Sequence, residues 1–178
     1  MRALFSISSL FFFFNAFAQP HNPVKWTYEA KCLKKKGEFE LVFKAKIEDE
    51  WAIYAQDVDC LECPTPTTID FERDFHYELI GDCIAEGDRK TAYDDLSKTS
   101  ISKYKNTVVF RQKIKVTASL DTVLGFICYS ACNNSRCLPA RDFNFVIKLP
   151  DCNDKKHHGQ SSDDLSFFKR LFRRNDSY

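Results

Sequence analysis

Alternation between apolar and polar side chains is the feature that most limits the fold of this chain. Between residues 39 and 48 every second residue is apolar, and the residues between them are mostly charged. Residues 108–116 repeat the pattern. A period of two puts one side of an extended segment in a core and the other side in water, which is typical of a half-buried β-strand. We therefore expect both segments to be strands.

Eight segments are predicted as strands, and none before residue 150 has convincing helical periodicity. The predicted strands are residues 25–33, 39–47, 51–56, 67–71, 75–79, 108–116, 123–129 and 143–149. Short strands at this spacing, separated by turn residues, predict an all-β sandwich.

The first 18 residues predict a secretory signal peptide. Arg2 gives a positive start, residues 3–14 form an apolar run, and Ala16-Phe17-Ala18 fits a cleavage site. The run is shorter than the roughly 20 residues that span a bilayer. We therefore expect cleavage near Ala18 and a periplasmic or secreted mature protein.

The charge balance of the mature chain excludes one large class of partners. The chain has 26 Lys and Arg and 25 Asp and Glu, and removal of Arg2 with the signal leaves 25 of each sign. A net charge near zero predicts no nucleic-acid partner. About 160 remaining residues suit one domain, placed here at residues 22–150. We expect no cofactor and no small-molecule substrate.

Two polar stretches are predicted to lie outside the regular strands. Residues 84–106 lack sustained periodicity, so we expect a long loop that acts as a lid or binding loop. Residues 151–178 are predicted to form a polar tail. Within that tail, Leu165, Phe168, Leu171 and Phe172 have helical spacing beside basic residues. They predict either a marginal helix or a short amphipathic segment for a membrane surface or a partner.

The loop at residues 129–139 carries the strongest chemical signal. It places Cys132 and Cys137 five positions apart, between apolar runs. Asn133, Asn134 and Ser135 favour a tight reversal, because their side chains bond nearby backbone and Asn tolerates positive φ. The two Cβ atoms can then approach to about 4 Å, as a disulfide requires.

From the residues alone, this pair is either redox-active or a structural staple of a hairpin. Exchange needs an exposed sulfur and a good leaving thiolate. Arg136 either favours the thiolate of Cys137 through its charge or is a solvated surface cation.

The other six cysteines are Cys32, Cys60, Cys63, Cys83, Cys128 and Cys152. They allow fifteen pairings, among which the sequence does not choose. Cys128 is expected to be structural, on the strand face opposite Tyr129. Cys60 and Cys63 have thioredoxin-like spacing, but Pro64 and Pro66 follow, so a loop or structural disulfide is favoured over a second redox pair.

A zinc site is a further alternative. Cys60 and Cys63 together with Cys132 and Cys137 supply four thiolates for tetrahedral zinc. Export to an oxidising compartment argues against it. His157 and His158 are interpreted as solvated tail residues.

At Cys132 to Pro139 the sequence resembles the N-terminal periplasmic domain of DsbD, a transmembrane thiol:disulfide interchange protein. In that loop two cysteines are separated by four residues, and Leu-Pro follows the second. Further matching motifs are Val24-Lys25-Trp26, Trp51-x-x-Tyr54-x-Gln56, Pro64-Thr65-Pro66-Thr67 and Gly125. The resemblance covers roughly residues 22–150. The chain departs from the family pattern at Ala52, where His is frequent, and at Cys63, where Gly is usual.

The resemblance implies an immunoglobulin-like sandwich with one reversible disulfide. It implies that Cys132 and Cys137 are the redox pair and that Cys137 forms mixed disulfides with partners. A thioredoxin-like thiol reductase or a membrane electron donor would supply electrons, and oxidised exported proteins would receive them. The family is linked to cytochrome c biogenesis.

Aromatic residues are expected to shield the disulfide or contact a partner. Tyr54 and Tyr129 are the main candidates near the sulfurs, and Trp51 is either a third or a core residue. The family's cap over the disulfide is expected within residues 84–106, at Tyr93 or Leu96. A rival prediction from a different class is a disulfide-stapled sandwich that only binds partners and has no redox activity.

Overall fold

The computed structural model describes residues 21–58, 65–94 and 99–152, which form nine strands and no helix. The strands are β1 (Val24–Cys32), β2 (Glu38–Ile47), β3 (Ala52–Tyr54), β4 (Thr68–Phe71), β5 (Tyr77–Asp94), β6 (Thr99–Val116), β7 (Thr122–Tyr129), β8 (Ala131–Cys132) and β9 (Arg141–Lys148). The expected signal peptide, the Cys60–Cys63 pair, Leu96 and the tail from residue 153 lie outside the described residues.

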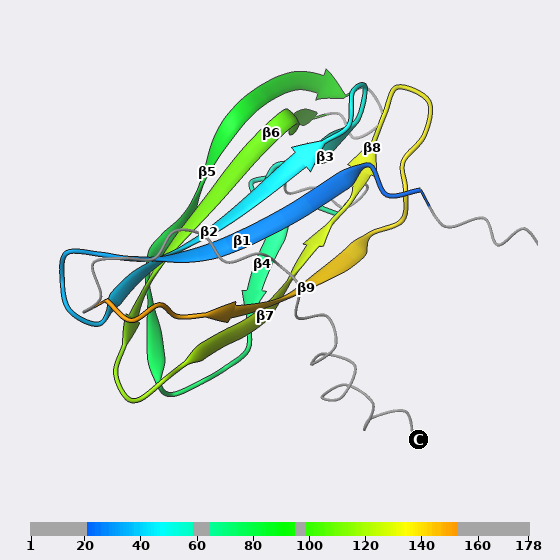
Figure 1. Cartoon of the computed structure of the whole chain (residues 1–178). Coiled ribbons are helices and arrows are strands. Elements are labelled where there is room, and N and C mark those ends of the chain that lie inside the picture. Colours follow the sequence, from blue (N-terminus) through cyan, green and yellow to red (C-terminus); the bar gives the residue numbers. More distant parts are fainter. Residues whose placement is uncertain (1–20, 59–64, 95–98, 153–178) are drawn as a thin grey trace, which may run out of the picture.

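Two antiparallel sheets pack face to face. The larger sheet has the order β1-β2-β6-β3-β8, with β5 paired to the other side of β6, and the smaller sheet has the order β4-β7-β9. Figure 1 shows β7 and β9 lying across from β1 and β2. The prediction of an all-β, immunoglobulin-like sandwich is confirmed.

The core between the sheets explains the alternating sequence pattern. Phe43 of β2, Phe110 of β6 and Phe145 of β9 are fully buried, and the rings of Phe43 and Phe145 lie 4.8 Å apart between centroids. Gly125 of β7 makes this packing possible. A Cβ atom at Gly125 would come within 2.4 Å of the Phe145 ring and 2.2 Å of the Asp70 carbonyl oxygen, so a larger side chain would displace the ring and the neighbouring strand.

The prediction of a long loop at residues 84–106 is wrong for the described part of that segment. β5 and β6 pair along nearly their whole length, from Tyr77 opposite Val116 to Asp94 opposite Thr99. Figure 1 shows the two strands curving side by side. Register shifts between Ile80 and Ile84 and between Gly87 and Asp88 break the side-chain alternation. Within the described part of the chain β5 pairs only with β6, so polar residues are tolerated on its other side and the sequence shows no period.

The boundary of the preceding strand also differs from the prediction. Phe75 lies in a turn and is 99% exposed, and β5 begins only at Tyr77. The described residues contain no helix that could cross a membrane.

One disulfide that the sequence did not identify ties the two sheets together. Cys32 at the end of β1 bonds to Cys152, which follows β9, with a Cα–Cα distance of 5.6 Å and a sequence separation of 120 residues. The bond therefore joins an edge strand of the large sheet to the end of the last strand of the small sheet.

Candidate functional site

The candidate site is the loop after β8, and its backbone is fixed by local hydrogen bonds. The side-chain oxygen of Asn133 accepts the N–H groups of Ser135 and Arg136, both at 2.9 Å. The N–H of Asn133 donates to the Arg136 carbonyl at 3.0 Å. The predicted tight reversal is confirmed. It uses the side chain of Asn133 and not positive φ, which among the described non-glycine residues occurs only at Glu50 and Asn106.

The loop is also anchored to the large sheet. Cys132 lies opposite Ala52 of β3, and Cys132 and Cys137 form a bridge of their own. The N–H of Leu138 donates to the Ala131 carbonyl at 2.9 Å. These bonds on both sides of the reversal hold the two cysteines opposite each other independently of any bond between the sulfurs.

Cys132 and Cys137 form a disulfide with unequal exposure of its two halves. The Cα atoms lie 4.0 Å apart. Cys132 is 3% exposed and packs with Tyr54 and Ile101, whereas Cys137 is exposed. An external thiolate can therefore reach the sulfur of Cys137, and the buried sulfur of Cys132 is the leaving group.

Tyr54 is an aromatic residue whose hydroxyl contacts the disulfide. Its hydroxyl oxygen lies 3.9 Å from Sγ of Cys137, and its side chain is 3% exposed. Thr67 fixes the backbone at this point, since both its N–H and its hydroxyl donate to the Tyr54 carbonyl, at 3.2 and 2.7 Å. The hydroxyl is placed to donate to a thiolate at Cys137.

Tyr129 has a different role from the one predicted. Its ring packs edge-on against Trp26 at 5.5 Å between centroids, and its hydroxyl donates to Oδ1 of Asn22 at 3.2 Å. Burial raises the pKa of Tyr129 above its ordinary value. Tyr129 therefore belongs to the hydrophobic core.

Two cations rest on aromatic rings next to the disulfide. The guanidinium carbon of Arg136 lies 5.7 Å from the centre of the Trp51 ring, and Nζ of Lys103 lies 4.8 Å from the centre of the Tyr54 ring. Trp51 is 7% exposed and belongs to the core cluster, so it serves both packing and support of Arg136.

The predicted cap residues are not brought to the sulfurs by the described structure. Tyr93 is 62% exposed on β5 and pairs with Ser100 of β6. Strands β6 and β3 separate β5 from β8. Leu96 lies outside the described residues. Val58 is the partly buried residue that packs against the cluster of Tyr54, Ile101 and Cys132.

The remaining described cysteines, Cys83 on β5 and Cys128 on β7, are free thiols. Burial is the largest cause that raises the pKa of each thiol above its ordinary value, and Asp142 and Asp70 add to the effect at Cys128. Cys128 lies on the face opposite buried Tyr129, as predicted. It carries no disulfide, so any structural role is one of packing.

The disulfide between Cys132 and Cys137 also affects the zinc alternative, because it uses two of the four thiolates that a tetrahedral site would need. Cys60 and Cys63, the other two, lie outside the described residues.

No family model and no curated protein matches the chain. Solved structures of similar fold include the N-terminal periplasmic domain of ScsB from Proteus mirabilis, at 17% identity and a TM-score of 0.49, covering 71% of this chain and 45% of that one. The reduced N-terminal domain of DsbD from Neisseria meningitidis is 13% identical with a TM-score of 0.48, covering 69% and 84%. The collagen-binding domain of a Staphylococcus aureus adhesin is 11% identical with a TM-score of 0.39, covering 73% and 99%. The chain thus spans less than half of the Proteus chain.

Proposed function

We propose that this protein is an exported thiol:disulfide interchange domain that relays electrons through the Cys132–Cys137 disulfide. The observation that carries the proposal is the asymmetry of this bond, with Cys137 exposed and Cys132 buried. The motif resemblance around Cys132 to Pro139 supports the same role. The proposed electron donor is a thioredoxin-like thiol reductase or a membrane donor, and the proposed acceptors are oxidised exported proteins.

Reduction of the domain begins at Cys137. A thiolate of the donor attacks Sγ of Cys137, the bond to Cys132 breaks, and Cys132 leaves as a thiolate that takes up a proton. The second thiol of the donor loses its proton and attacks the donor's first sulfur, which releases Cys137 as a thiolate. Two electrons thus pass from the donor, which becomes a disulfide, to the domain, which holds a proton at Cys132 and a thiolate at Cys137.

The second half of the cycle runs in the opposite sense. The Cys137 thiolate attacks a disulfide of the acceptor and forms a mixed disulfide, while the acceptor's other sulfur leaves as a thiolate. The Cys132 thiol then loses its proton and attacks Sγ of Cys137, which closes the domain disulfide and releases the acceptor's second sulfur as a thiolate. The two acceptor thiolates become a dithiol by taking up the proton from Cys132 and one from water.

The backbone around the pair favours rapid re-formation of the Cys132–Cys137 disulfide in the second half of the cycle. The bonds of Asn133 and of Leu138 do not involve the sulfurs, so they can persist after reduction and keep Cys132 next to Cys137. A thiol held at reacting distance behaves as if it were at very high concentration. The Tyr54 hydroxyl, 3.9 Å from Cys137 Sγ, is available to hydrogen-bond the thiolate.

Export is part of the proposal. Both disulfides of the described residues, Cys32–Cys152 and Cys132–Cys137, are compatible with an oxidising compartment. The predicted signal peptide that ends near Ala18 would direct the chain there.

Trapping of the mixed disulfide tests this function. A reduced Cys132→Ser protein should form a stable mixed disulfide through Cys137 with an oxidised model protein, because the resolving thiol is absent. A Cys137→Ser protein is the matched control and should trap nothing through the buried Cys132. Equal trapping by both variants, or by neither, would contradict the proposed relay.

The rival function, a stapled sandwich that only binds, differs in the reduction potential of the pair. A labile, electron-carrying pair should be half-reduced above about −300 mV. The potential is measured by thiol trapping and peptide mapping across a graded thiol buffer. If Cys132–Cys137 is reduced only at potentials below this value, the pair is a structural staple and the binding function is favoured.

A further inference from the structure

Three lysines lie together on the outer face of the large sheet, next to the candidate site. Lys90 of β5 pairs with Lys103 of β6, and Lys103 pairs with Tyr54 of β3. Paired residues of antiparallel strands point to the same face. Lys90, Lys103 and the ring that contacts Cys137 therefore form one row across three strands. Lys105, two residues along β6, points to the same face as Lys103. We call Lys90, Lys103 and Lys105 the basic row.

The carboxylates on this part of the sheet do not balance the basic row. Asp88, which pairs with Lys105 in the register, forms an ion pair with Lys90 at 3.0 Å. Its second oxygen accepts a hydrogen bond from Asn106 at 3.1 Å. Among the side chains that the structure describes here, one carboxylate thus stands with three ammonium groups, and Lys103 faces the ring of Tyr54.

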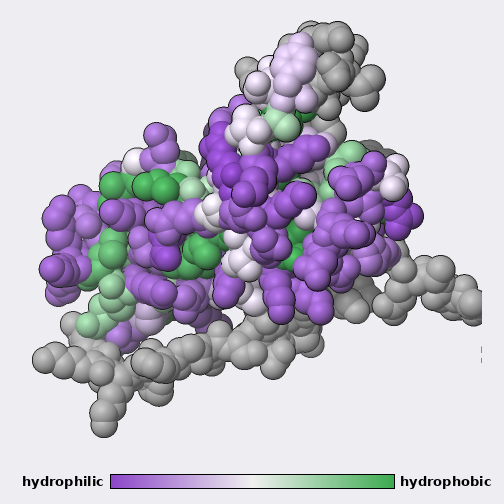
Figure 2. All heavy atoms as spheres, turned by 90° about the horizontal axis from the view of Figure 1, so that it is seen from above, coloured by the Kyte–Doolittle hydropathy of each residue, from purple (hydrophilic) through white to green (hydrophobic). Residues whose placement is uncertain are grey.

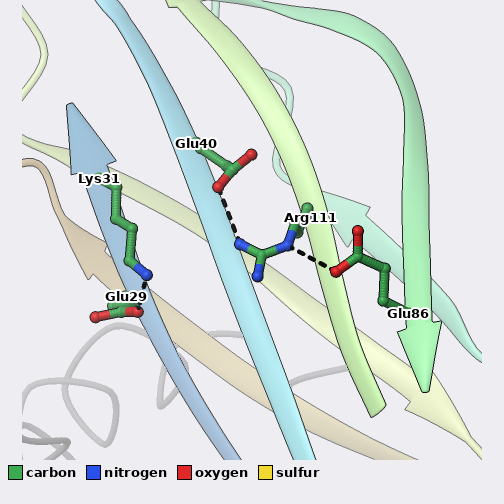
Figure 3. A network of polar contacts seen from close by, with 5 residues as sticks. All are labelled: Glu29, Lys31, Glu40, Glu86 and Arg111. Atoms are coloured by element: carbon green, nitrogen blue, oxygen red, sulfur yellow. Dashed lines mark hydrogen bonds and ion pairs between the residues drawn. The ribbon is translucent and has the colours of Figure 1, made fainter. Parts of the chain in front are cut away.

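The other half of the same face is built differently. Figure 3 shows Arg111, also on β6, between Glu40 of β2 and Glu86 of β5. The guanidinium contacts the two carboxylates at 3.0 and 3.4 Å. Lys31 of β1 is paired with Glu29 at 2.8 Å. Arg111 and Lys31 each have a carboxylate partner, whereas Lys103, beside the disulfide, rests on an aromatic ring.

The arrangement of Lys90 directly opposite Lys103 is unfavourable for folding, because like charges across a strand pair repel. The strand ladder needs neither lysine, so the fold does not explain the pair. A negatively charged partner would relieve the repulsion and would be attracted before contact. The face of the molecule seen in Figure 2 is mostly hydrophilic, which suits recognition through charge.

We propose that the basic row is the docking surface for a redox partner protein whose reactive cysteine is bordered by acidic side chains. This proposal rests on the proposed function of Cys132–Cys137. Lys103 is separated from the exposed sulfur of Cys137 by the Tyr54 ring alone, so carboxylates on the row would lie beside a cysteine placed at Cys137. Arg136 is not counted in the basic row. Its guanidinium lies over the Trp51 ring, and the two acidic residues Asp49 and Glu50 immediately precede Trp51 in the sequence.

Charged disulfide probes test the docking surface. The probes are short cysteine peptides with Asp, Ser or Lys on both sides of the cysteine, each as a mixed disulfide with thionitrobenzoate. Reduced protein releases the coloured leaving group, and its second-order rate is measured in stopped flow. Each rate is divided by that of β-mercaptoethanol with the same probe, and the rate of reduced Cys137→Ser protein is subtracted to remove the other thiols.

The expected result is a preference for the acidic probe of about tenfold over the neutral one at low ionic strength, reduced to about twofold or less in 0.5 M salt by screening. The triple variant Lys90→Gln, Lys103→Gln, Lys105→Gln should lose this preference. A matched triple variant on the same sheet, Lys44→Gln, Lys113→Gln, Lys115→Gln, should keep it.

The outcomes separate the docking surface from the redox function. Equal rates with the acidic and neutral probes would overturn the docking surface, and so would a preference for the acidic probe that survives loss of the basic row. In both cases the relay stands as long as the probe is released through Cys137. Release that is no faster than in Cys137→Ser protein would overturn the relay and the docking surface with it.

Discussion

The two disulfides of the described residues join the chain in opposite ways. Cys32–Cys152 closes a loop of 120 residues and ties the end of β1 to the segment after β9. Cys132–Cys137 closes a loop of five residues whose backbone is already held by hydrogen bonds. The first bond restricts most of the unfolded chain, and the second restricts only a short segment of it.

Loop-closure entropy gives the size of this difference. In the chain-entropy treatment, a loop of 120 residues is worth about 5 kcal/mol and one of five or six residues about 2 kcal/mol. Exposure does not separate the two bonds, because Cys32 and Cys152 are exposed and so is Cys137. The two bonds differ in that Cys132 is buried and in that opening the short loop costs little free energy of folding. A disulfide suited to exchange is therefore one that the fold does not depend on.

The largest expected effect is on electron transfer. Cys137→Ser should abolish exchange, because it removes the accessible sulfur. The double variant Cys32→Ala/Cys152→Ala should stay within about threefold of the wild-type rate at a temperature where it is folded, since that bond is distant from the loop in the strand order. The measurement is the rate of exchange with reduced thioredoxin. Comparable losses in both variants would remove the distinction between the two bonds.

Stability should show the reverse order. Cys32→Ala/Cys152→Ala should lower the free energy of unfolding by about 4 to 5 kcal/mol, and Cys132→Ala/Cys137→Ala by about 2 kcal/mol, following the loop lengths. Urea unfolding of the three proteins under non-reducing conditions measures both values. A larger loss from the short loop would mean that Cys132–Cys137 is the principal staple of the sandwich.

Tyr54→Phe tests the environment of the reactive sulfur with a smaller change. The hydroxyl is the group that lies 3.9 Å from Cys137 Sγ. Loss of one hydrogen bond to the thiolate, worth about 1 kcal/mol, should slow alkylation of Cys137 in the reduced protein about two- to tenfold at pH 7. Tyr129→Phe is the control, because its hydroxyl bonds Asn22 in the core. An equal effect of both substitutions would point to altered packing instead.

The free thiol Cys83 should react slowly with alkylating reagents at neutral pH. Burial raises its pKa, so less of it is thiolate at a given pH than in an unfolded chain, and only the thiolate is alkylated. Native Cys83 should react with iodoacetamide several-fold more slowly than the same residue in urea at pH 8, and its rate should still rise above pH 9. Peptide mapping gives the rate. A native rate equal to that in urea would show that Cys83 is accessible and competes with Cys137.

Part of the candidate site was predictable because local interactions form it. The reversal follows from Asn133 and its neighbours, whose side chains bond backbone within three residues. The approach of Cys132 to Cys137 follows from that reversal. Tyr129 was predicted to lie near the disulfide, but its ring packs in the core against Trp26.

The sequence by itself determined the all-β class, because a period of two is a property of each strand alone and the core requires it at residues such as Phe43 and Phe110. The tertiary structure alone decided the pairing of Cys32 with Cys152, the pairing of β5 with β6 and the row that joins Lys90 to Lys103 and Tyr54. These features depend on strand order and register. Register is set by the side chains that must face the core together and by the turns that join the strands, and it cannot be read from one strand alone.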